Sequence, residues 1–498
     1  MWLCLFLALL APLRTLSVDI FTGEYISSLY SYGDPETLPQ LHHTPFGYGG
    51  ASTGGSTNES SIYVVSNHTE LREALALPFT KTIYVNGTIE GSQLDNGTYP
   101  RSSSYFNPLT STDSGSSSQF DFMLYLLSLN ATYISLVEDA ISRNVTFEGK
   151  NATEYRALLG HQNGWRPVVS NTQKAQVGFS LTNNTSLIGM GKGAALNGIN
   201  LYLSSVDNVW IRNLKLISPA DCFPAPETFP SSWNARFDAV GLVTATNVLV
   251  DGCELQDQLS GEYVQPDIIA PGWQVDRFDG LFDCEDGTDN VTFSHNIIRN
   301  HHKSLLLGGG TKEAPRDLGK MHFTIFGNHF NNSASRNPTM RFGTFDVYAN
   351  LFEDINDNQP RFGANLKRDE KVPLDAVFEY HLGVYNQSTI QLRDNVFLQS
   401  GKVPDDTSRI FTISEATIPE LPARVCIRDS GVPPTLNGAA IDLGSIAQDT
   451  VDWFVNEGDS AMDAVLVTCE DVAVGDYQTF ETVQEVTRYV LREAGQSP

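Results

Sequence analysis

The chain has 498 residues, of which 41% are hydrophobic and 18% are charged, so it can bury a substantial core and is not disordered overall. Its formal net charge of −26 argues against nucleic acid as a partner, because phosphate binding requires a broad basic surface. The length admits either two or three ordinary domains or one large repetitive domain.

Residues 1–17 are predicted to form a signal peptide. Trp2–Ala11 is an apolar segment too short to span a bilayer. No other apolar run approaches the length of a transmembrane helix. We therefore expect a secreted, extracellular protein without a membrane partner. Acceptor motifs for N-glycosylation are frequent, which favours a secreted glycoprotein. They begin at Asn58, Asn67, Asn86, Asn96, Asn130, Asn144, Asn151, Asn183, Asn184, Asn290, Asn331 and Asn386.

The cysteines allow at most two disulfides in the mature chain. Cys4 belongs to the leader, and the others are Cys222, Cys253, Cys284, Cys426 and Cys469. Their number is odd, so one thiol stays free. We expect Cys426–Cys469 first, because both lie in the C-terminal segment, and Cys222–Cys253 second. No Cys-x-x-Cys motif indicates zinc.

The N-terminal part alternates loops with short regular elements. Residues 18–60 are loop-like and include the glycine-rich stretch Phe46–Gly55. Strands are predicted at Ile62–Val65 and Thr82–Val85, with a short helix at Glu70–Ala76 between them.

Residues 92–175 interrupt this rhythm and are interpreted as a long insertion. Within it, Phe120–Ile141 is predicted to form one helix, with Met123, Leu126, Leu127 and Leu129 on or near one face.

From about residue 180, short β-branched strands recur beside asparagines. One series is Asn184, Asn208, Asn247 and Asn290, and a second is Asn296, Asn328, Asn350 and Asn395. The interval between Asn328 and Asn350 is 22 residues, and intervals of 39 to 45 are interpreted as two such units. This period predicts an all-β parallel solenoid in which equivalent asparagines stack along the coil. A doubly wound α/β fold and a β-sandwich are the alternatives.

The predicted organisation has three parts. A signal peptide at 1–17 precedes a β-helical catalytic domain at 18–432, which carries the 92–175 insertion. A C-terminal segment at 433–498 packs on or caps the coil, with helices predicted at Asp449–Phe454 and Glu481–Glu493.

Three aspartates lie within apolar, strand-like segments. Asp238 follows Phe237, and Asp279 and Asp283 belong to Phe278–Asp283. A bare carboxylate in such surroundings needs a partner. Asp279 and Asp283 are four residues apart, so on a strand both point to one side, and Asp238 precedes them by about two coil turns. Together the three can form an oxygen site for Ca²⁺; turn-capping aspartates are the alternative.

A basic island follows these acids. Arg299–Arg368 contains ten Lys/Arg and six Asp/Glu, which indicates an anion-binding site in an otherwise acidic chain. Its candidate residues are Lys303, Arg336 and Arg341, and Pro338 supplies the bend needed to aim both arginines at one place. Salt bridges to nearby acids are the alternative.

These candidates belong to segments that occur in a fixed order. The segments are Phe46–Gly55, Ser186–Gly193, Asn208–Leu214, Asp279–Asp283 with Val291–Asn296, His302-Lys303 and Arg336–Gly343. In this order they resemble the pectate lyase family of polysaccharide lyases, in particular a fungal-like secreted member. The resemblance covers about residues 40–90 and 180–400. It implies a right-handed, single-stranded parallel β-helix with helical caps and long loops.

The resemblance also implies roles for individual residues. Asp238, Asp279 and Asp283 resemble the Ca²⁺ ligands, Arg336 the catalytic base, and Lys303 and Arg341 the residues that bind substrate carboxylates. Two positions depart from the family pattern. Arg236 stands where a further acid is frequent, which puts calcium affinity in question, and Gly252 replaces a histidine.

The implied reaction is β-elimination on pectate, a polygalacturonate. The proton at C5 is removed and the C4 oxygen is expelled, and cations on the uronate carboxylate stabilise the developing charge. Because a free guanidinium stays protonated, the base must have a pKa lowered by surrounding cations, and we expect a non-acidic pH optimum. A monomer is expected.

Three other functions remain open from the sequence. A pectin lyase would take methyl-esterified pectin without calcium. A β-helical glycoside hydrolase would use the aspartates as acid and base. A catalytically impaired pectin-binding β-helix protein is the non-enzymatic alternative, and Arg236 and Gly252 are the residues that favour it.

Overall fold

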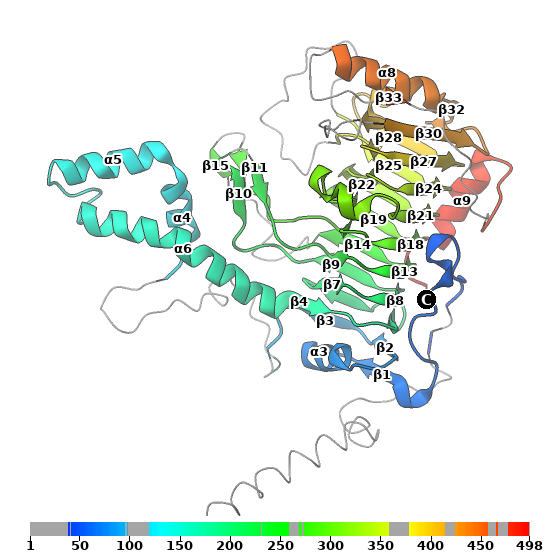
Figure 1. The fold of residues 1–498 in the computed structure, drawn as a ribbon, viewed down its shortest axis with the longest axis horizontal. Helices are drawn as coiled ribbons and strands as arrows, with labels where there is room; N and C mark the ends of the chain where they lie inside the picture. The colour runs from blue at the N-terminus through cyan, green and yellow to red at the C-terminus, as the bar shows by residue number, and fades with distance from the viewer. Residues whose placement is uncertain are drawn as a thin grey trace, which may run out of the picture.

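The chain folds into a parallel coil of strands with helices at its ends and an arm of helices on one side (Figure 1). The computed structural model describes residues 38–39, 41–94, 97, 119–230, 232–257, 268–270, 273–357, 378–413, 424–456, 465–466 and 477–497. The proposed signal peptide lies outside these residues.

Three parallel sheets form the coil. Sheet A contains β1 (Ile62–Val65), β2 (Lys81–Val85), β5 (Thr185–Gly189), β8 (Asp207–Arg212), β13 (Thr246–Asp251), β18 (Asp289–Ser294), β21 (His322–Phe326), β24 (Thr344–Tyr348), β27 (Ser388–Arg393), β30 (Arg424–Ser430) and β33 (Val465–Leu466). Sheet B contains β3 (Thr88–Glu90), β6 (Ala195–Asn197), β9 (Lys215–Ser218), β14 (Glu254–Asp257), β19 (Ile297–Lys303), β22 (His329–Ser335), β25 (Leu351–Ile355), β28 (Val396–Ser400), β31 (Thr435–Leu436) and the antiparallel β32 (Ala439–Ala440). Sheet C contains β4 (Gly178–Ser180), β7 (Asn200–Ser204), β12 (Val240–Val243), β17 (Phe282–Glu285), β20 (Leu305–Leu307), β23 (Thr339–Met340), β26 (Leu382–Val384) and β29 (Phe411–Ile413).

Helices and two hairpins lie outside the sheets. The helices are α3 (His68–Ala76), α4 (Phe122–Leu129), α5 (Ala131–Ser142), α6 (Ala152–Val177), α7 (Ala314–Asp317), α8 (Leu443–Asn456) and α9 (Val483–Glu493). The hairpins pair β10 (Ala225–Thr228) with β11 (Ser232–Asn234), and β15 (Ile268–Ala270) with β16 (Trp273–Gln274).

One turn of the coil takes one strand from each sheet. β17, β18 and β19 follow one another, and β20 then pairs with β17 in register. The predicted all-β parallel β-helix is therefore confirmed. The interpretation of the longer intervals is wrong, because β13 pairs directly with β18 and β24 with β27. An interval of about 45 residues is therefore one turn that includes a long loop. The loop leaves the coil and returns, so the strands on either side of it still pair directly.

Inward-facing side chains fill the coil with a continuous hydrophobic core. Leu201, Val240, Phe282 and Leu305 occupy equivalent positions on adjacent strands of sheet C and are all fully buried. The core is closed at its first turn by apolar residues of α3 and at its last by apolar residues of α8.

The two asparagine series have different roles. The side chains of Asn296, Asn328, Asn350 and Asn395 form a ladder in which each Nδ2 donates to the Oδ1 of the next, at 3.0–3.2 Å. This confirms the predicted stacking. In the other series, from Asn184 to Asn290, each residue has a positive φ between 53° and 63°, a conformation that asparagine tolerates better than most residues.

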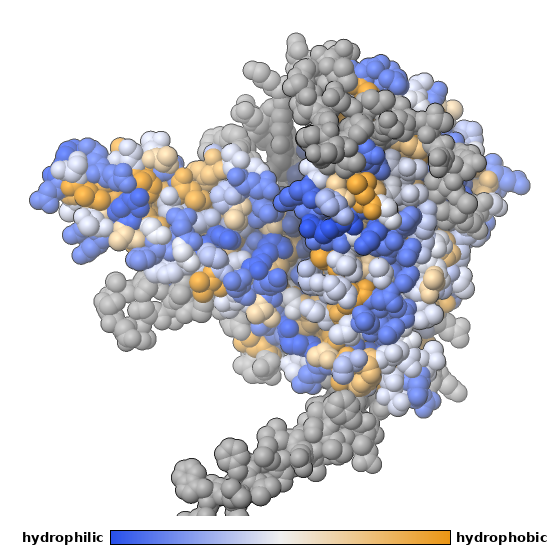
Figure 2. Space-filling model, in the orientation of Figure 1, coloured by the Kyte–Doolittle hydropathy of each residue, from blue (hydrophilic) through white to orange (hydrophobic). Residues whose placement is uncertain are grey.

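The arm projects from the coil beside sheet C (Figure 1) and exposes interleaved hydrophobic and hydrophilic residues (Figure 2). The predicted single helix at Phe120–Ile141 is two helices, α4 and α5. They separate at Asn130, whose side chain accepts a hydrogen bond from Tyr133 N and so begins α5. Leu126 is buried but Met123 is 59% exposed, so these two side chains do not share one face.

The N-terminal segment and α9 cover sheet A on the side opposite the arm (Figure 1). The glycine-rich segment lies against the sheet: Gly49 N donates to Thr292 Oγ1 at 2.9 Å, and a Cβ there would lie 2.6 Å from Val248 O. Only glycine permits this approach. None of the helices in the described residues is long and apolar enough to cross a membrane.

The disulfide prediction is partly wrong. Cys222 and Cys253 are buried and do not form a disulfide, and neither does Cys284. Cys222 packs against the arm, whereas Cys253 lies in the coil core. Cys426 is disulfide-bonded, and its expected partner Cys469 lies outside the described residues.

Candidate active site

The three predicted acids converge at the start of two adjacent strands of sheet C. Asp238 precedes β12, Asp279 precedes β17, and Asp283 lies within β17, which pairs with β12. Their carboxylate oxygens lie within 4.8 Å of one another. Asp279 is in the turn before the strand, so the even-spacing argument for Asp279 and Asp283 does not apply. Asp238 is one coil turn away, not two.

Backbone geometry supports this convergence. Gly280 N donates to Asp238 Oδ1 at 3.0 Å, which ties one turn to the next. A Cβ at Gly280 would collide with the Asp283 carboxylate. A side chain at position 280 would therefore displace the Asp283 carboxylate from its place over the turn.

Burial and mutual repulsion strain this acidic triad. Burial, followed by the neighbouring Asp279, raises the pKa of Asp283 to about 8. Burial, followed by Asp283 and Asp279, also raises the pKa of Asp238 well above its ordinary value. No described cation forms an ion pair with Asp238 or Asp283. Oxygen ligands in this arrangement are those that a hard divalent cation such as Ca²⁺ prefers.

Lys303 and Arg336 stand beside the acids. Lys303, the last residue of β19, places its Nζ 3.1 Å from Asp279 and 3.5 Å from Asp276. Burial lowers its pKa, but these two acids raise it more. Arg336 lies in the turn between β22 and β23 with a φ of 58°, a strained conformation for a non-glycine residue.

The guanidinium of Arg336 is held close to the acids without being paired. It makes no hydrogen bond or ion pair with any described residue, yet Asp283 raises its pKa against the effect of burial. Its donors are therefore available to a ligand that lies over the triad.

Arg341 follows directly after β23, which is two strands from β17 in sheet C. Its Nη1 donates to Gly308 O at 2.8 Å, and its guanidinium lies 4.5 Å from the centre of the Tyr385 ring. Tyr385 is close enough to Arg341 and Arg336 for both arginines to lower its pKa, although burial raises that pKa overall. Tyr385 therefore contacts Arg341 and lies near Arg336.

The neighbouring histidines have structural surroundings. His301 Nδ1 lies 2.8 Å from both oxygens of Asp257. Burial lowers the pKa of His302, but Asp276 and Glu379 raise it to about 9. The Asp276 carboxyl has a pKa of about 2 in spite of burial, because His302 and Lys303 face it.

Sequence reasoning missed three residues of this region. Asp276 could have been found, because it precedes Asp279 by one short turn. Tyr380 and Tyr385 carried no recognisable motif. Both act on Arg336 electrostatically, a relation that only the packing of β26 beside β23 creates.

The two departures from the family pattern have local partners. Arg236 turns to the arm, where its Nη1 donates to Ser170 Oγ at 3.0 Å and Asn171 Oδ1 at 2.8 Å. A Cβ at Gly252 would lie 3.5 Å from Gly495 O, beyond the end of α9. The C-terminal segment therefore approaches the position where the family has a histidine.

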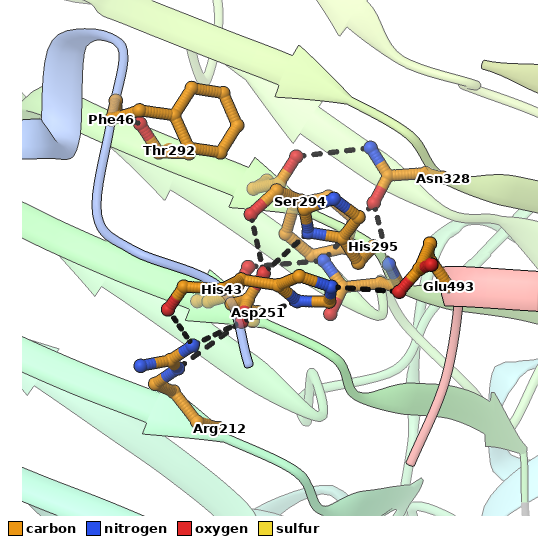
Figure 3. Close-up of polar contacts among 12 residues, drawn as sticks. His43, Phe46, Arg212, Asp251, Thr292, Ser294, His295, Asn328 and Glu493 are labelled. Carbon is orange, nitrogen blue, oxygen red and sulfur yellow. Dashed lines mark hydrogen bonds and ion pairs between the residues drawn. The ribbon is translucent and has the colours of Figure 1, made fainter. Parts of the chain in front are cut away.

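A second cluster of potential metal ligands lies on sheet A, formed by His43, Asp251 and His295 (Figure 3). Asp251 already accepts hydrogen bonds from Arg212 at 2.7 Å and from His295 at 2.7 Å. The His43 and His295 rings are stacked with centroids 3.6 Å apart, so their nitrogen lone pairs lie in parallel planes. This cluster is charge-compensated, and its stacked rings do not converge on one ion.

These features define a parallel β-helix protein with acidic and basic side chains gathered where the strands of sheet C begin. Residues 166–412 match the family model described as pectate lyase. The pectate lyase of Bacillus subtilis is 27% identical over 408 residues, which cover 80% of this chain and 82% of that protein. A thermostable pectate lyase has a TM-score of 0.66 at 23% identity, covering 93% of this chain and 99% of its own. A pectate lyase bound to a hexasaccharide has a TM-score of 0.65 at 23% identity, covering 92% and 98%.

The chain belongs to the pectate lyase family. The predictions of a pectate lyase and of a polysaccharide lyase are thereby confirmed. The likeness to the solved structures supports the fold.

Proposed function

We propose that the chain is a secreted, glycosylated and monomeric lyase that cleaves de-esterified (1→4)-α-D-galacturonan by Ca²⁺-assisted β-elimination. The observation that supports this most directly is the juxtaposition of an acidic triad, in which only Asp279 has an ion-pair partner among the described residues, with Lys303 and Arg336. The hexasaccharide bound to a pectate lyase of similar fold supports a polysaccharide substrate.

The acidic triad suits Ca²⁺. Asp238, Asp279 and Asp283 offer only oxygen ligands, and burial followed by the neighbouring acids raises the pKa values of Asp238 and Asp283. A bound Ca²⁺ would neutralise a substrate carboxylate and make the adjacent C–H bond more acidic. Arg236 is held by the arm and leaves the triad to these three acids.

The chain's own cations carry the remaining roles. Lys303 binds a uronate carboxylate beside Asp279, and Arg341 is oriented for the same task by Gly308 O and the Tyr385 ring. Arg336 accepts the C5 proton. Asp283 raises the pKa of Arg336 and so favours its protonated form. The role of base therefore requires the acids to be neutralised first.

The alternatives are weaker on the same observations. A neutral methyl ester gives the acidic triad no function, which disfavours a pectin lyase. A glycoside hydrolase gives no role to Arg336. A pectin-binding protein without activity is favoured only by Arg236 and Gly252, which depart from the family pattern, and the match to the pectate lyase family disfavours it.

The deciding experiment follows the ultraviolet absorbance of the unsaturated product on polygalacturonate. We expect the absorbance to grow in the presence of Ca²⁺ and to stop on addition of EDTA. New reducing ends without this absorbance would indicate hydrolysis. Retention on pectate without cleavage would indicate a binding protein.

A further inference from the structure

Tyr202 lies on the face of sheet C that carries the acidic triad. Tyr202, Gly241 and Asp283 occupy the same register position on the consecutive strands β7, β12 and β17. The neighbours of Tyr202 in β7, Leu201 and Leu203, are fully buried in the coil, so the tyrosine points outward. Strands in a sheet are about 4.8 Å apart, which places Tyr202 roughly 10 Å from Asp283 along the coil.

Gly241 has no side chain, so the outer surface of sheet C is open between Tyr202 and the acidic triad. A Cβ at Gly241 would lie 3.2 Å from Asp238 Oδ2 and 3.6 Å from Tyr202 Cδ2. The tyrosine ring and the Asp238 carboxylate therefore border the same spot, with no side chain between them. In the opposite direction, Leu306 and Thr339 continue the row as nearly buried residues and offer no comparable platform.

The arm adds cations beside this ring. Lys174, in the last turn of α6, places its Nζ 5.8 Å from the centre of the Tyr202 ring. It makes no ion pair with an acid in the described part of the chain. Ser170 and Asn171, one turn earlier on the same face of α6, hold Arg236. This face of α6 therefore carries one positive charge, Lys174, beside Tyr202 and holds a second, Arg236, in the segment before β12.

We propose that Tyr202 and Lys174 form a further uronate-binding subsite, two strands from Asp283 and walled by α6. The C–H groups on one face of a pyranose ring match the electron-rich face of the tyrosine, and the ammonium of Lys174 pairs with the carboxylate of that sugar. The inference rests on the proposed function, since it places another unit of the same polymer that lies over the triad.

The subsite predicts a dependence on substrate length. Only a chain long enough to reach from the triad to Tyr202 benefits from it. Tyr202→Ala is expected to raise KM for polygalacturonate roughly threefold to tenfold, and Lys174→Ala about twofold to fivefold. Neither variant should change KM for the shortest oligogalacturonate that the enzyme cleaves.

The chain provides a matched control. Lys150 stands over the Tyr155 ring at 4.2 Å in the same arm, remote from sheet C, so Lys150→Ala should behave as wild type. Tyr202→Phe keeps the ring and should keep the wild-type KM, whereas Tyr202→Leu fills the space without the ring and should resemble Tyr202→Ala. A rise in KM for Tyr202→Leu that also appears in Tyr202→Phe would contradict the ring's role.

Two outcomes separate this inference from the proposed function. If the wild type cleaves polygalacturonate but Tyr202→Ala and Lys174→Ala leave its KM unchanged, the subsite is refuted and the function stands. If the wild type does not cleave, the proposed function fails. Affinity electrophoresis in gels containing polygalacturonate then tests the subsite alone, with weaker retardation of Tyr202→Leu than of Tyr202→Phe expected and equal retardation refuting it.

Discussion

Asp251 and Asp283 are both buried carboxylates of the coil, the first on sheet A and the second on sheet C, but the charges around them differ. Asp251 accepts hydrogen bonds from Arg212, His295 and Ser294. Despite burial, its histidine and arginine neighbours hold its pKa well below the ordinary value. Asp283 faces Asp238 and Asp279, and its pKa rises to about 8.

The comparison shows that burial alone does not define the role of an acid. Desolvation acts on both carboxylates in the same direction, and the sign of the final shift is set by their neighbours. Asp251 is compensated within the chain and joins three segments distant in sequence. In the triad of Asp283 only Asp279 is paired within the described part of the chain, with Lys303, which suits a site whose remaining counter-charge arrives with a ligand.

The largest effect is expected from Arg336→Lys. The compact ammonium of lysine cannot replace the planar guanidinium of a positioned arginine. Turnover on polygalacturonate should therefore fall by about 10²–10⁴-fold. The unfolding temperature should stay close to that of the wild type. Arg316→Lys is the control, because Arg316 is an exposed arginine paired with Asp286. An active Arg336→Lys enzyme would refute the assigned base.

Asp251→Asn should cause the largest loss of stability. It leaves buried Arg212 without its counter-charge, and breaking a buried pair in this way costs about 3–5 kcal/mol. The free energy of unfolding, measured with urea, checks this. Asp289→Asn is the control on the same sheet, because the Asp289–His322 pair is partly exposed and is worth about 1 kcal/mol or less. Equal losses of stability in the two variants would contradict the assigned role of Asp251 as the counter-charge of buried Arg212.

Asp283→Asn should have the opposite effect in EDTA. Removal of one of three crowded acids relieves repulsion, so the metal-free protein should gain about 1–4 kcal/mol. Wild type should gain about 2.7 kcal/mol at Ca²⁺ concentrations one hundred times the Kd, and the variant much less. Thermal unfolding with and without Ca²⁺ measures both effects. Asp357→Asn, in an exposed pair with Lys402, should change neither.

The smallest effect is a pH dependence carried by His43. Burial lowers its pKa, but Asp251 and Glu493 raise it above the ordinary histidine value of 6.5, while burial lowers the pKa of the stacked His295. A raised pKa stabilises the fold below about pH 6.5 and loses this effect as the pH rises through the folded value. The difference in unfolding temperature between wild type and His43→Gln should therefore be larger near roughly pH 6 than near pH 9. A constant difference would mean that His43 is neutral. Arg212 and Tyr489 also face this cluster.

The coil could be predicted because its signals are local. Asn296, Asn328 and Asn350 recur at the spacing of successive turns. The side-chain oxygens of Asn328 and Asn350 accept hydrogen bonds from the backbone N and the Nδ2 of the preceding asparagine. The interpretation of the longer asparagine intervals as two turns is wrong, because sequence spacing cannot distinguish two turns from one turn with a long loop. The predicted Cys222–Cys253 disulfide is also wrong, because the two cysteines pack in different hydrophobic clusters.

The glycosylation motifs illustrate the same limit. Asn67, Asn130 and Asn151 each begin a helix by accepting backbone hydrogen bonds with their side chains. Asn386 is 1% exposed. A motif of three residues therefore predicts an acceptor for a glycan, but the local structure decides whether the side chain has another role or is accessible.

The sequence by itself determined the repeat, the strand-forming residues and the identities of the six candidate site residues, since these depend on spacing and side-chain type. The tertiary structure decided that Asp238 lies one turn from Asp283, that Tyr385 adjoins Arg336 and Arg341, and that α6 lies beside sheet C. The reason is physical: residues distant along the chain meet only through the pairing of strands, and the charges that shift a pKa act through space.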